Sequence, residues 1–198
     1  MGDFDPSCFK DPIALRTEWS PSKKGGTSIE LQRLQSCGIG CMNFVPSPVA
    51  QVMGWMFLLF GLGTIAAFGP FSLEDGIPTL NLYQNPLIAL LIGLAFSVTG
   101  AWILRTAKMR NEFNTINGQF NQGKNPALRL SEVHALQLLG ERCHQPNDPS
   151  FTSYELNLVL TSGRRVNIVD QGNLKRLRTD AQILADFLGK PLWDIAGE

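Results

Sequence analysis

Apolar residues are concentrated in two long stretches near the middle of the chain. Residues 49–70 contain one amide and one hydroxyl side chain among apolar residues and glycines, and residues 86–104 contain only Ser97 and Thr99 as polar side chains. At a helical rise of about 1.5 Å, roughly 20 residues cross a hydrocarbon layer about 30 Å thick. Both stretches are long enough, so we predict a transmembrane helical hairpin over residues 45–105, with a connecting loop at 71–85.

The alternative is a pair of buried helices in a soluble protein. We favour transmembrane helices, because a chain of 198 residues could hardly cover two such helices on every face. Trp55, Tyr83 and Trp102 lie near the ends of the stretches, and such amphipathic rings prefer the headgroup level of a bilayer. Their positions are consistent with the proposed boundaries.

Flanking charge predicts the orientation of the hairpin. No charged residue lies between Arg33 and Glu74 or between Asp75 and Arg105. The cations gather outside the hairpin, at Arg16, Lys23, Lys24, Arg33, Arg105, Lys108 and Arg110. Because cytoplasmic flanks carry the excess of Lys and Arg, we expect both termini in the cytoplasm of a bacterium, the loop in the periplasm and the chain in the inner membrane.

The four cysteines would then all lie in a reducing compartment. Cys8, Cys37, Cys41 and Cys143 are accordingly expected as free thiols. A zinc site could be assembled from them with His144, but their spacing fits no common motif. We expect no metal and no cofactor.

Small residues four positions apart predict where the helices are approached by another helix. Such spacing allows close backbone contact within a membrane. The residues concerned are Gly63, Ala67, Gly93, Ser97 and Ala101. Neither span contains an ionisable residue, which argues against a pump, channel or transporter.

Polar residues dominate the two flanking regions. Residues 1–44 read as an extended segment with strand-like alternation only from Thr27 to Leu34, and we expect this segment to lie against residues 106–198. In the latter region, alternation over residues 154–161 and 165–170 around Ser162-Gly163 predicts a β-hairpin. A helix should follow from about Asn173 to Leu188, with Leu177 and Leu184 on its buried face. Strands followed by one amphipathic helix predict a small cytoplasmic α+β domain.

Several segments resemble a known group of proteins. HALQLL, YELNLVL, SGRRVNIVDQGN, DAQILADFLG and PLWD in the C-terminal half, with LRTEWSPSKKGG near the N-terminus, are similar to uncharacterised bacterial membrane proteins with two spans. The resemblance covers most of the chain and implies no established activity. The order of hairpins and then a helix also resembles bacterial pleckstrin-homology-like domains, which is a likeness of fold and carries little functional weight.

Enzymatic chemistry has little support in the sequence. There is no G-x-x-x-x-G-K-[ST], H-E-x-x-H, G-x-S-x-G or C-x-x-C motif. His134 lies among leucines, where we favour a structural role; Glu132 and Glu141 are conceivable partners. We therefore predict no catalytic residue.

Five cations near the C-terminus form the candidate binding site. They are Arg164, Arg165, Lys175, Arg176 and Arg178. Three of them lie in the first turns of the final helix, where the macrodipole disfavours cations, so an anionic ligand is a reasonable interpretation. Anionic lipid headgroups are the nearest candidates, and a solvated charged face is the alternative. We expect the helix cluster to be the main contact, because a strand separates it from the hairpin turn.

Function is expected to follow from anchoring. The sequence favours a non-enzymatic, membrane-anchored interaction or scaffold module that binds anionic lipid, a protein partner or both. Its helices could also pair with a membrane protein or with a second copy of the chain. The alternative is an accessory structural subunit of a larger membrane complex, such as an energy-converting one. A formal net charge of zero gives no reason to expect nucleic acid.

Overall fold

The computed structural model describes residues 4–22, 26–68, 71–74, 77–80, 86–107, 111–123, 125, 127–145 and 148–197. The chain divides into two compact units, Pro46–Lys108 and a second unit made of Met1–Val45 together with Met109–Glu198. We call the first the helical unit and the second the sheet unit. Some residues used in the orientation argument lie outside the described residues, namely Lys23, Lys24, Asp75, Tyr83, Lys108 and Arg110.

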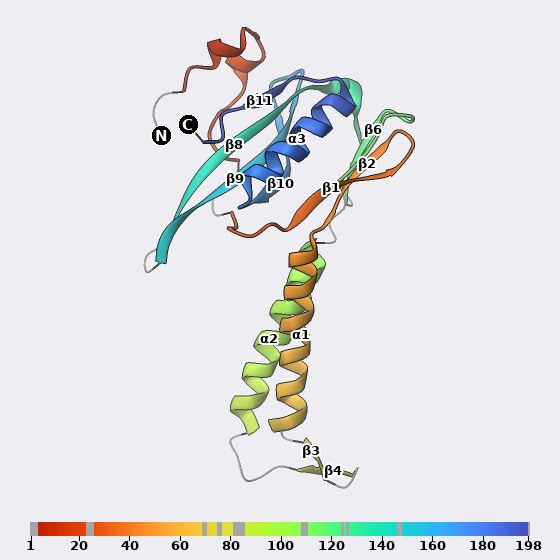
Figure 1. The fold of residues 1–198 in the computed structure, drawn as a ribbon, viewed down its shortest axis with the longest axis vertical. Coiled ribbons are helices and arrows are strands. Elements are labelled where there is room, and N and C mark those ends of the chain that lie inside the picture. Colours follow the sequence, from red (N-terminus) through yellow and green to blue (C-terminus); the bar gives the residue numbers. More distant parts are fainter. Residues whose placement is uncertain are drawn as a thin grey trace. The chain divides into compact units, whose positions relative to one another are not determined.

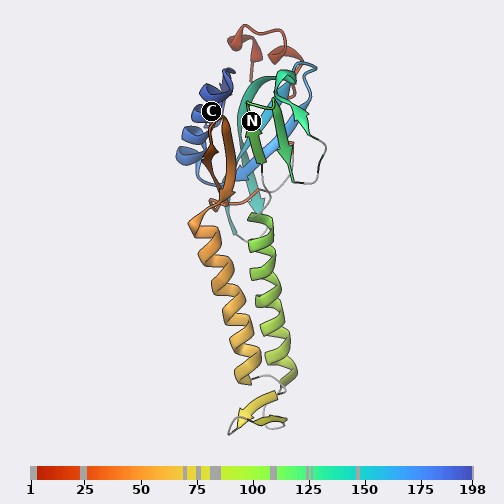
Figure 2. The same ribbon diagram turned by 90° about the vertical axis from the view of Figure 1, so that its right-hand side faces the viewer.

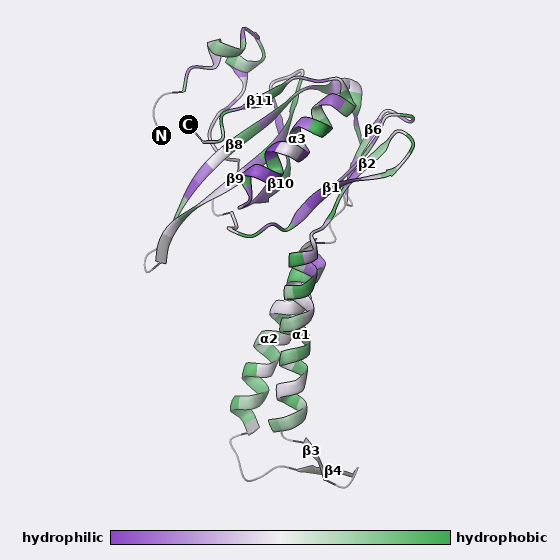
Figure 3. Cartoon of the chain, viewed as in Figure 1, coloured by the Kyte–Doolittle hydropathy of each residue, from purple (hydrophilic) through white to green (hydrophobic). Residues whose placement is uncertain are grey.

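The helical unit contains two helices long and apolar enough to cross a membrane. They are α1 (Pro48–Phe68) and α2 (Pro86–Ala107), which pack side by side (Figures 1 and 2). The Ser47 hydroxyl accepts the Ala50 backbone N–H at 3.0 Å and caps the start of α1. Figure 3 shows the apolar colour along both helices. Between them, β3 (Phe71–Glu74) and β4 (Ile77–Leu80) form a short antiparallel pair that the sequence did not predict.

The sheet unit contains two sheets. One has the strand order β1-β2-β5-β6-β7, with β1 (Gln32–Gly38), β2 (Cys41–Pro46), β5 (Asn111–Asn114), β6 (Gln119–Gln122) and β7 (Leu128–Arg129). The other has the order β10-β9-β8-β11, with β8 (Val133–Gln145), β9 (Asp148–Leu160), β10 (Arg165–Gln171) and β11 (Leu192–Asp194). The predicted hairpin is present as β9 and β10, which pair antiparallel. Strands β1 and β2 show that the N-terminal region contributes directly to a sheet.

The final helix, α3 (Leu174–Leu188), is present as predicted. Asn173 caps it by accepting the Arg176 backbone N–H at 3.1 Å, and Gly189 ends it in the left-handed conformation with φ 62°. Leu177 and Leu184 are fully buried, as the sequence predicted. They belong to one core that contains leucines of β8 and β9 together with Phe44, Phe113 and others of the five-stranded sheet.

The second face of the β8–β9 sheet is covered by the N-terminal segment, residues 4–22. This segment contains two 3-10 helices, η1 (Pro6–Phe9) and η2 (Ala14–Arg16). Ala14 packs with Ala135 and Val159, while Trp193 lies 5.7 Å from the ring of Trp19 and is only 2% exposed. A third short 3-10 helix, η3 (Leu130–Glu132), leads into β8. Both faces of the β8–β9 hairpin are thus covered, one by α3 and the other by the N-terminal segment.

A bulge in β10 ties the two sheets together. The register of β10 against β9 shifts between Asn167 and Val169. The backbone oxygens of Asn167 and Ile168 there accept side-chain N–H groups of the other sheet, from Gln122 at 2.6 Å and Asn111 at 2.5 Å. A strand bulge releases backbone groups from the ladder, and here two amide side chains satisfy them.

Candidate functional site

Two of the three cations of the predicted helix cluster are committed to ion pairs. Arg176 lies 3.3 Å from Asp180, whose side chain is 1% exposed. Arg178 pairs with Asp194, with a second bond at 3.2 Å, and also donates to the Ala196 backbone oxygen. The carboxylate of Asp194 holds the pKa of Arg178 above its ordinary value, although burial opposes this. These contacts fasten the C-terminal residues to α3, and of the cluster Lys175 alone has no ion pair among the described residues.

The two arginines of the predicted hairpin turn differ from each other. Arg164 is exposed. The Arg165 side chain is only 7% exposed and donates to the Ser20 backbone oxygen at 2.7 Å. It also lies 3.4 Å from Glu18. Arg165 therefore anchors the N-terminal segment, and this limits its availability to a ligand.

Arg16 joins these two arginines at the β9–β10 turn. Its guanidinium donates to the Thr161 backbone oxygen at 3.4 Å. The positive φ of Gly163, 84°, allows a tight turn, and a Cβ built there would lie 3.4 Å from the Arg16 backbone oxygen. Arg16, Arg164 and Arg165 line one shallow depression with Glu18, Pro21 and Ser22. We call Arg16, Arg164 and Arg165 the arginine surface.

The arginine surface is separate from the helix cluster. A second depression lined by Arg164 and Arg165 lies toward Phe120 and Leu128 of the five-stranded sheet. A third is formed by α3 alone and includes Lys175 and Arg178. No described residue lines both the α3 depression and either depression at the turn, which agrees with the predicted separation of the two groups.

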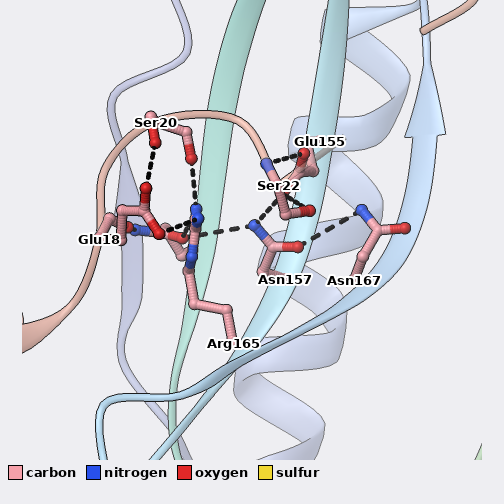
Figure 4. A network of polar contacts seen from close by, with 8 residues as sticks. Glu18, Ser20, Ser22, Glu155, Asn157, Arg165 and Asn167 are labelled. Carbon is pink, nitrogen blue, oxygen red and sulfur yellow. Dashed lines mark hydrogen bonds and ion pairs between the residues drawn. The ribbon is translucent and has the colours of Figure 1, made fainter. Parts of the chain in front are cut away.

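Beneath the arginine surface lies a buried polar network (Figure 4). Glu155 is 2% exposed and accepts the Ser22 backbone N–H at 2.8 Å, the Ser22 hydroxyl at 2.6 Å and the Asn157 amide at 2.5 Å. Gln137 donates to the Glu18 backbone oxygen at 3.1 Å. Polar side chains on one face of β8 and β9 thus replace water as partners for the N-terminal segment. This network fixes the position of Arg165 and, through the segment, of Arg16.

His134 also holds the N-terminal segment, residues 4–22, against the sheet. Its Nε2 lies 2.6 Å from an Asp11 carboxylate oxygen. Burial raises the pKa of Asp11, but hydrogen bonds from His134 and from backbone N–H groups outweigh it, so the pKa lies below its ordinary value. The partner of His134 is thus Asp11, while Glu132 pairs with Arg129. The geometry is that of a structural hydrogen bond.

The predicted helix-packing residues fall on two different faces. A Cβ on Gly93 would lie 2.7 Å from the Gly61 backbone oxygen, and a Cβ on Gly61 would lie 2.4 Å from the Ser97 hydroxyl. Gly93 and Ser97 are therefore in the α1–α2 contact. By contrast, a Cβ on Gly63 would meet nothing within 4 Å, and Ala67 and Ala101 are exposed. For these three the predicted packing does not occur within the helical unit.

Sequence reasoning missed the glycines that complete this contact. They are Gly54, Gly61 and Gly100. Gly54 faces Gly100, and Gly61 faces Gly93, so each helix places two glycines seven residues apart. A seven-residue spacing keeps one side of a helix toward its neighbour at a small crossing angle. That spacing was readable from the sequence, whereas the spacing of four selected a face of α1 that does not contact α2.

The prediction of four free thiols is wrong for two cysteines. Cys37 and Cys41 form a disulfide across the β1–β2 turn, with 5.2 Å between their Cα atoms. Cys8 is an exposed free thiol and Cys143 a buried one. The paired cysteines lie at adjoining strand ends, where a two-residue turn brings their sulfurs together.

Among the described residues, no group of three or more His, Cys, Asp or Glu side chains could hold a metal ion. The arginine surface is suited to binding anions, because guanidinium groups bind phosphate or carboxylate oxygens.

Neither profiles of known protein families nor curated proteins match this chain. The resemblance to two-span bacterial membrane proteins therefore stays a prediction.

Proposed function

We propose that this chain is a non-enzymatic, membrane-anchored interaction module. The observation that carries the proposal is the exposure of α1 and α2. Within their apolar windows only 17% and 11% of residues are buried. The two helices pack on each other through small residues and leave large side chains such as Leu59, Phe60 and Leu91 exposed. Core helices of a soluble protein would be covered, whereas hydrocarbon can cover these side chains in a bilayer.

The arginine surface is proposed to bind anionic groups. Arg16 and Arg164 are both exposed and line the same depression. Arg165 adds a third positive charge there, and the carboxylate of Glu18 cancels one of the three. Anionic lipid headgroups are the source we favour, since a domain tethered to a bilayer meets them at high local concentration. The helix cluster is the weaker candidate, because Asp180 and Asp194 neutralise two of its three cations.

We place the chain in the inner membrane of a bacterium with both termini in the cytoplasm. The support is the charge pattern, in which Arg16 and Arg33 precede α1 and Arg105 lies in the last turn of α2. A reporter active only in the periplasm should work when inserted near Asp75 and fail when fused after Glu198. Activity at the C-terminal fusion would reverse the orientation.

The proposed likeness of the sheet unit to pleckstrin-homology-like domains rests on antiparallel strands followed by α3. Strand β11 adds to the sheet after the helix and pairs in parallel with β8. That likeness concerns the fold, and the binding proposal does not depend on it.

A second candidate function is that of an accessory subunit in a larger membrane complex. It is favoured by the exposed small residues Gly63, Ala67 and Ala101, which leave room for a helix of another protein or of a second copy. Extraction in a mild detergent followed by mass spectrometry separates the two functions. A stoichiometric set of co-purifying membrane proteins would favour the subunit.

The lipid-binding test needs the sheet unit without the two apolar helices, and the strand order shows where the chain can be rejoined. Strands β2 and β5 are antiparallel neighbours, with Phe44 opposite Asn111. A two-residue Asn-Gly turn joining residues 1–44 to residues 111–198 should therefore close a hairpin in place of the helical unit. We call this the hairpin-less variant, and its folding is checked first by circular dichroism.

The hairpin-less variant should co-sediment with phosphatidylglycerol vesicles and not with phosphatidylcholine vesicles. At about 1 kcal/mol per basic residue, the double change Arg16→Gln and Arg164→Gln should weaken binding roughly 30-fold. The matched control removes two charges elsewhere, by Lys175→Gln and Lys190→Gln, and should bind almost as the parent does. Binding should also fall with added salt. Equal losses in the two double variants would mean that net charge alone attracts the chain, and the arginine surface would then not be the site.

A further inference from the structure

The turn between β1 and β2 carries a disulfide that the proposed function does not use. Cys37 and Cys41 are separated by four positions, and the bridge encloses Gly38, Ile39 and Gly40. None of these residues lines the depressions at the arginine surface. The inference that follows therefore stands whether or not the chain binds lipid.

The bridge is open to an attacking thiol. Cys37 is exposed, Cys41 is partly exposed, and Ile39 between them is 93% exposed. Attack on a disulfide requires an in-line approach of a thiolate to one sulfur, so access governs its rate. A structural disulfide in a core would instead be shielded by its surroundings.

The two turns at the bridge carry no acidic residue that would repel an anionic attacker. The neighbouring turn between β5 and β6 lies beside this one, because the Thr115 backbone N–H donates to the Gly40 oxygen at 2.9 Å (Figure 1). Neither turn contains an acidic residue from Gln35 to Met42 or from Asn114 to Gly118. Ile116, 75% exposed, adds apolar surface next to Gly40. A thiolate that approaches over these two turns thus meets neutral and apolar side chains.

The fold does not depend on the bridge. The first four residues of strand β2 pair with β5, from Cys41 opposite Asn114 to Phe44 opposite Asn111. The positive φ angles of Gly38 and Gly40, 141° and 63°, allow the turn without a covalent link. A short ring removes less entropy from the unfolded chain than a long one, so its loss changes stability little by comparison.

We propose that Cys37 and Cys41 form a reversible thiol–disulfide exchange site that a dithiol reductant opens. The thiolate of the reductant attacks the Sγ atom of the more exposed Cys37, and the bond to Cys41 breaks, which leaves a mixed disulfide and a Cys41 thiolate. The second thiol of the reductant then attacks the mixed disulfide and releases Cys37. Two electrons and two protons pass to the chain, and the reductant becomes a disulfide. An oxidised dithiol of the same class closes the bridge by the reverse steps.

This chemistry also reconciles the disulfide with the proposed orientation. A buried, permanent disulfide would argue for an oxidising compartment, whereas an exchangeable pair can exist in a reducing one. In the oxidised state the loop closed by the disulfide holds Ile39 beside the turn between β5 and β6. In the reduced state only the hydrogen bonds between the strands hold Ile39 in that place. The redox state therefore changes the freedom of one exposed apolar side chain.

The test uses the full chain in lipid nanodiscs, with Cys8→Ser and Cys143→Ser so that the pair is the sole source of thiols. The protein is equilibrated in mixtures of reduced and oxidised dithiothreitol, quenched with acid and alkylated with a maleimide, and the added mass is measured. We expect two alkylations to appear together as the reducing fraction rises and to disappear when it falls. The tryptophan emission spectrum should stay that of the folded chain throughout.

Three outcomes would overturn the proposal. The first is resistance of the pair to reduction until denaturant is added, which identifies a structural bridge. The second is failure of the bridge to re-form under oxidised dithiothreitol, and the third is unfolding of the sheet unit on reduction. A control with Cys37→Ser in the same background should show one alkylation at every mixture. If Cys37 is the attacked sulfur, Cys41→Ser in that background should react with an aromatic disulfide faster than Cys37→Ser does. Because the measurement is made on purified protein, it does not depend on which side of a membrane the sheet unit occupies.

Discussion

Gly61 and Gly93 approach each other so closely that neither can carry a side chain without displacing the other helix. A Cβ on Gly61 would lie 2.5 Å from the Gly93 backbone oxygen, and a Cβ on Gly93 would lie 2.7 Å from that of Gly61. Backbone atoms cannot move aside as the end of a side chain can. Close approach of backbones is also what stabilises a helix pair where no hydrophobic effect acts between the helices.

Gly61→Ala should therefore weaken the helix pair, whereas Gly63→Ala should not. The two glycines lie in the same helix, but a Cβ on Gly63 would meet nothing within 4 Å. We expect a loss of about 1–3 kcal/mol for Gly61→Ala and almost none for Gly63→Ala. Unfolding of the full chain by sodium dodecyl sulfate in mixed micelles, followed by circular dichroism, measures both. A comparable loss for Gly63→Ala would indicate that another copy or partner packs on that face.

Leu177→Asp should unfold the sheet unit, and Ile183→Asp should be tolerated. Both residues lie in α3, but Leu177 is 0% exposed and Ile183 is 44% exposed. Burying an unpaired carboxylate costs about 4 kcal/mol or more, a large part of the stability of a domain. Chemical denaturation of the hairpin-less variant gives the comparison. A folded Leu177→Asp variant would mean that the core around α3 can admit water.

Glu155→Ala should detach the N-terminal segment before it unfolds the sheets. The substitution leaves the Ser22 N–H, the Ser22 hydroxyl and the Asn157 amide without their acceptor, at a cost of about 1–3 kcal/mol for each group that stays buried. In the hairpin-less variant the remaining tryptophans are Trp19 and Trp193, which lie 5.7 Å apart beneath this segment. Their emission should shift to longer wavelength at lower denaturant than the circular dichroism change.

The matched control for that experiment is Glu132→Ala. Its carboxylate pairs with Arg129 at the surface, where the two side chains are 40% and 77% exposed, so the cost should be at most about 0.5 kcal/mol. Coincident transitions in Glu155→Ala would show instead that the segment and the sheets unfold as one unit.

Asp180→Asn should stabilise the sheet unit at neutral pH. Burial raises the pKa of Asp180 above its ordinary value of 3.8, although the Leu34 N–H and Arg176 act in the opposite direction. The folded chain then holds this proton at pH values where the unfolded chain has released it, so the contribution of Asp180 to stability falls as pH rises above that value. The advantage of the Asn variant should be largest near pH 7 and should vanish near pH 3.

Asp180→Ala separates charge from hydrogen bonding in that prediction. Asn keeps an oxygen that can accept the Leu34 N–H, which lies 2.9 Å from Asp180, but Ala does not. The Ala variant should therefore lose about 1–3 kcal/mol at every pH. Urea unfolding of the hairpin-less variant at a series of pH values measures both substitutions. A stability of the Asn variant that falls below the parent at pH 7 would mean that the Arg176 pair outweighs the burial of Asp180.

Local patterns predicted the elements that are regular over many residues. The two apolar stretches predicted α1 and α2 to within three residues at each end, and alternation predicted the C-terminal half of β9, β10 and the buried stripe of α3. These depend on periodicity within one segment, which a sequence displays directly. Only the start of strand β1 (Gln32–Gly38) was predicted, by the alternation from Thr27 to Leu34, and β2 was missed. The Leu31 and Leu34 backbone N–H groups bond to Gln171 and Asp180, which lie far away in the chain, and no local pattern indicates these partners.

The candidate site depended mainly on contacts between residues far apart in the chain. The spacing of four between Arg176 and Asp180 on the final helix already indicated that Asp180 could neutralise one cation. Asp194, the partner of Arg178, lies beyond the end of the helix, and no local pattern indicates that pair. Arg16 joined the site only because the N-terminal segment folds back over β8 and β9. One buried clue was available: Asp180 interrupts the apolar stripe of Leu177, Ala181 and Leu184, and a charge in such a place needs a partner.

The bond between Leu34 and Asp180 also sets an order of events during synthesis. The two residues are 146 positions apart. At about 5–20 residues per second, strand β1 leaves the ribosome roughly 7–30 s before the helix that completes its surroundings exists. Both apolar helices emerge within that interval and can pair from local contacts alone. The N-terminal strands must meanwhile wait with unpaired edges, so nascent chains of this protein should be protected by a chaperone or by the ribosome surface until α3 has been made.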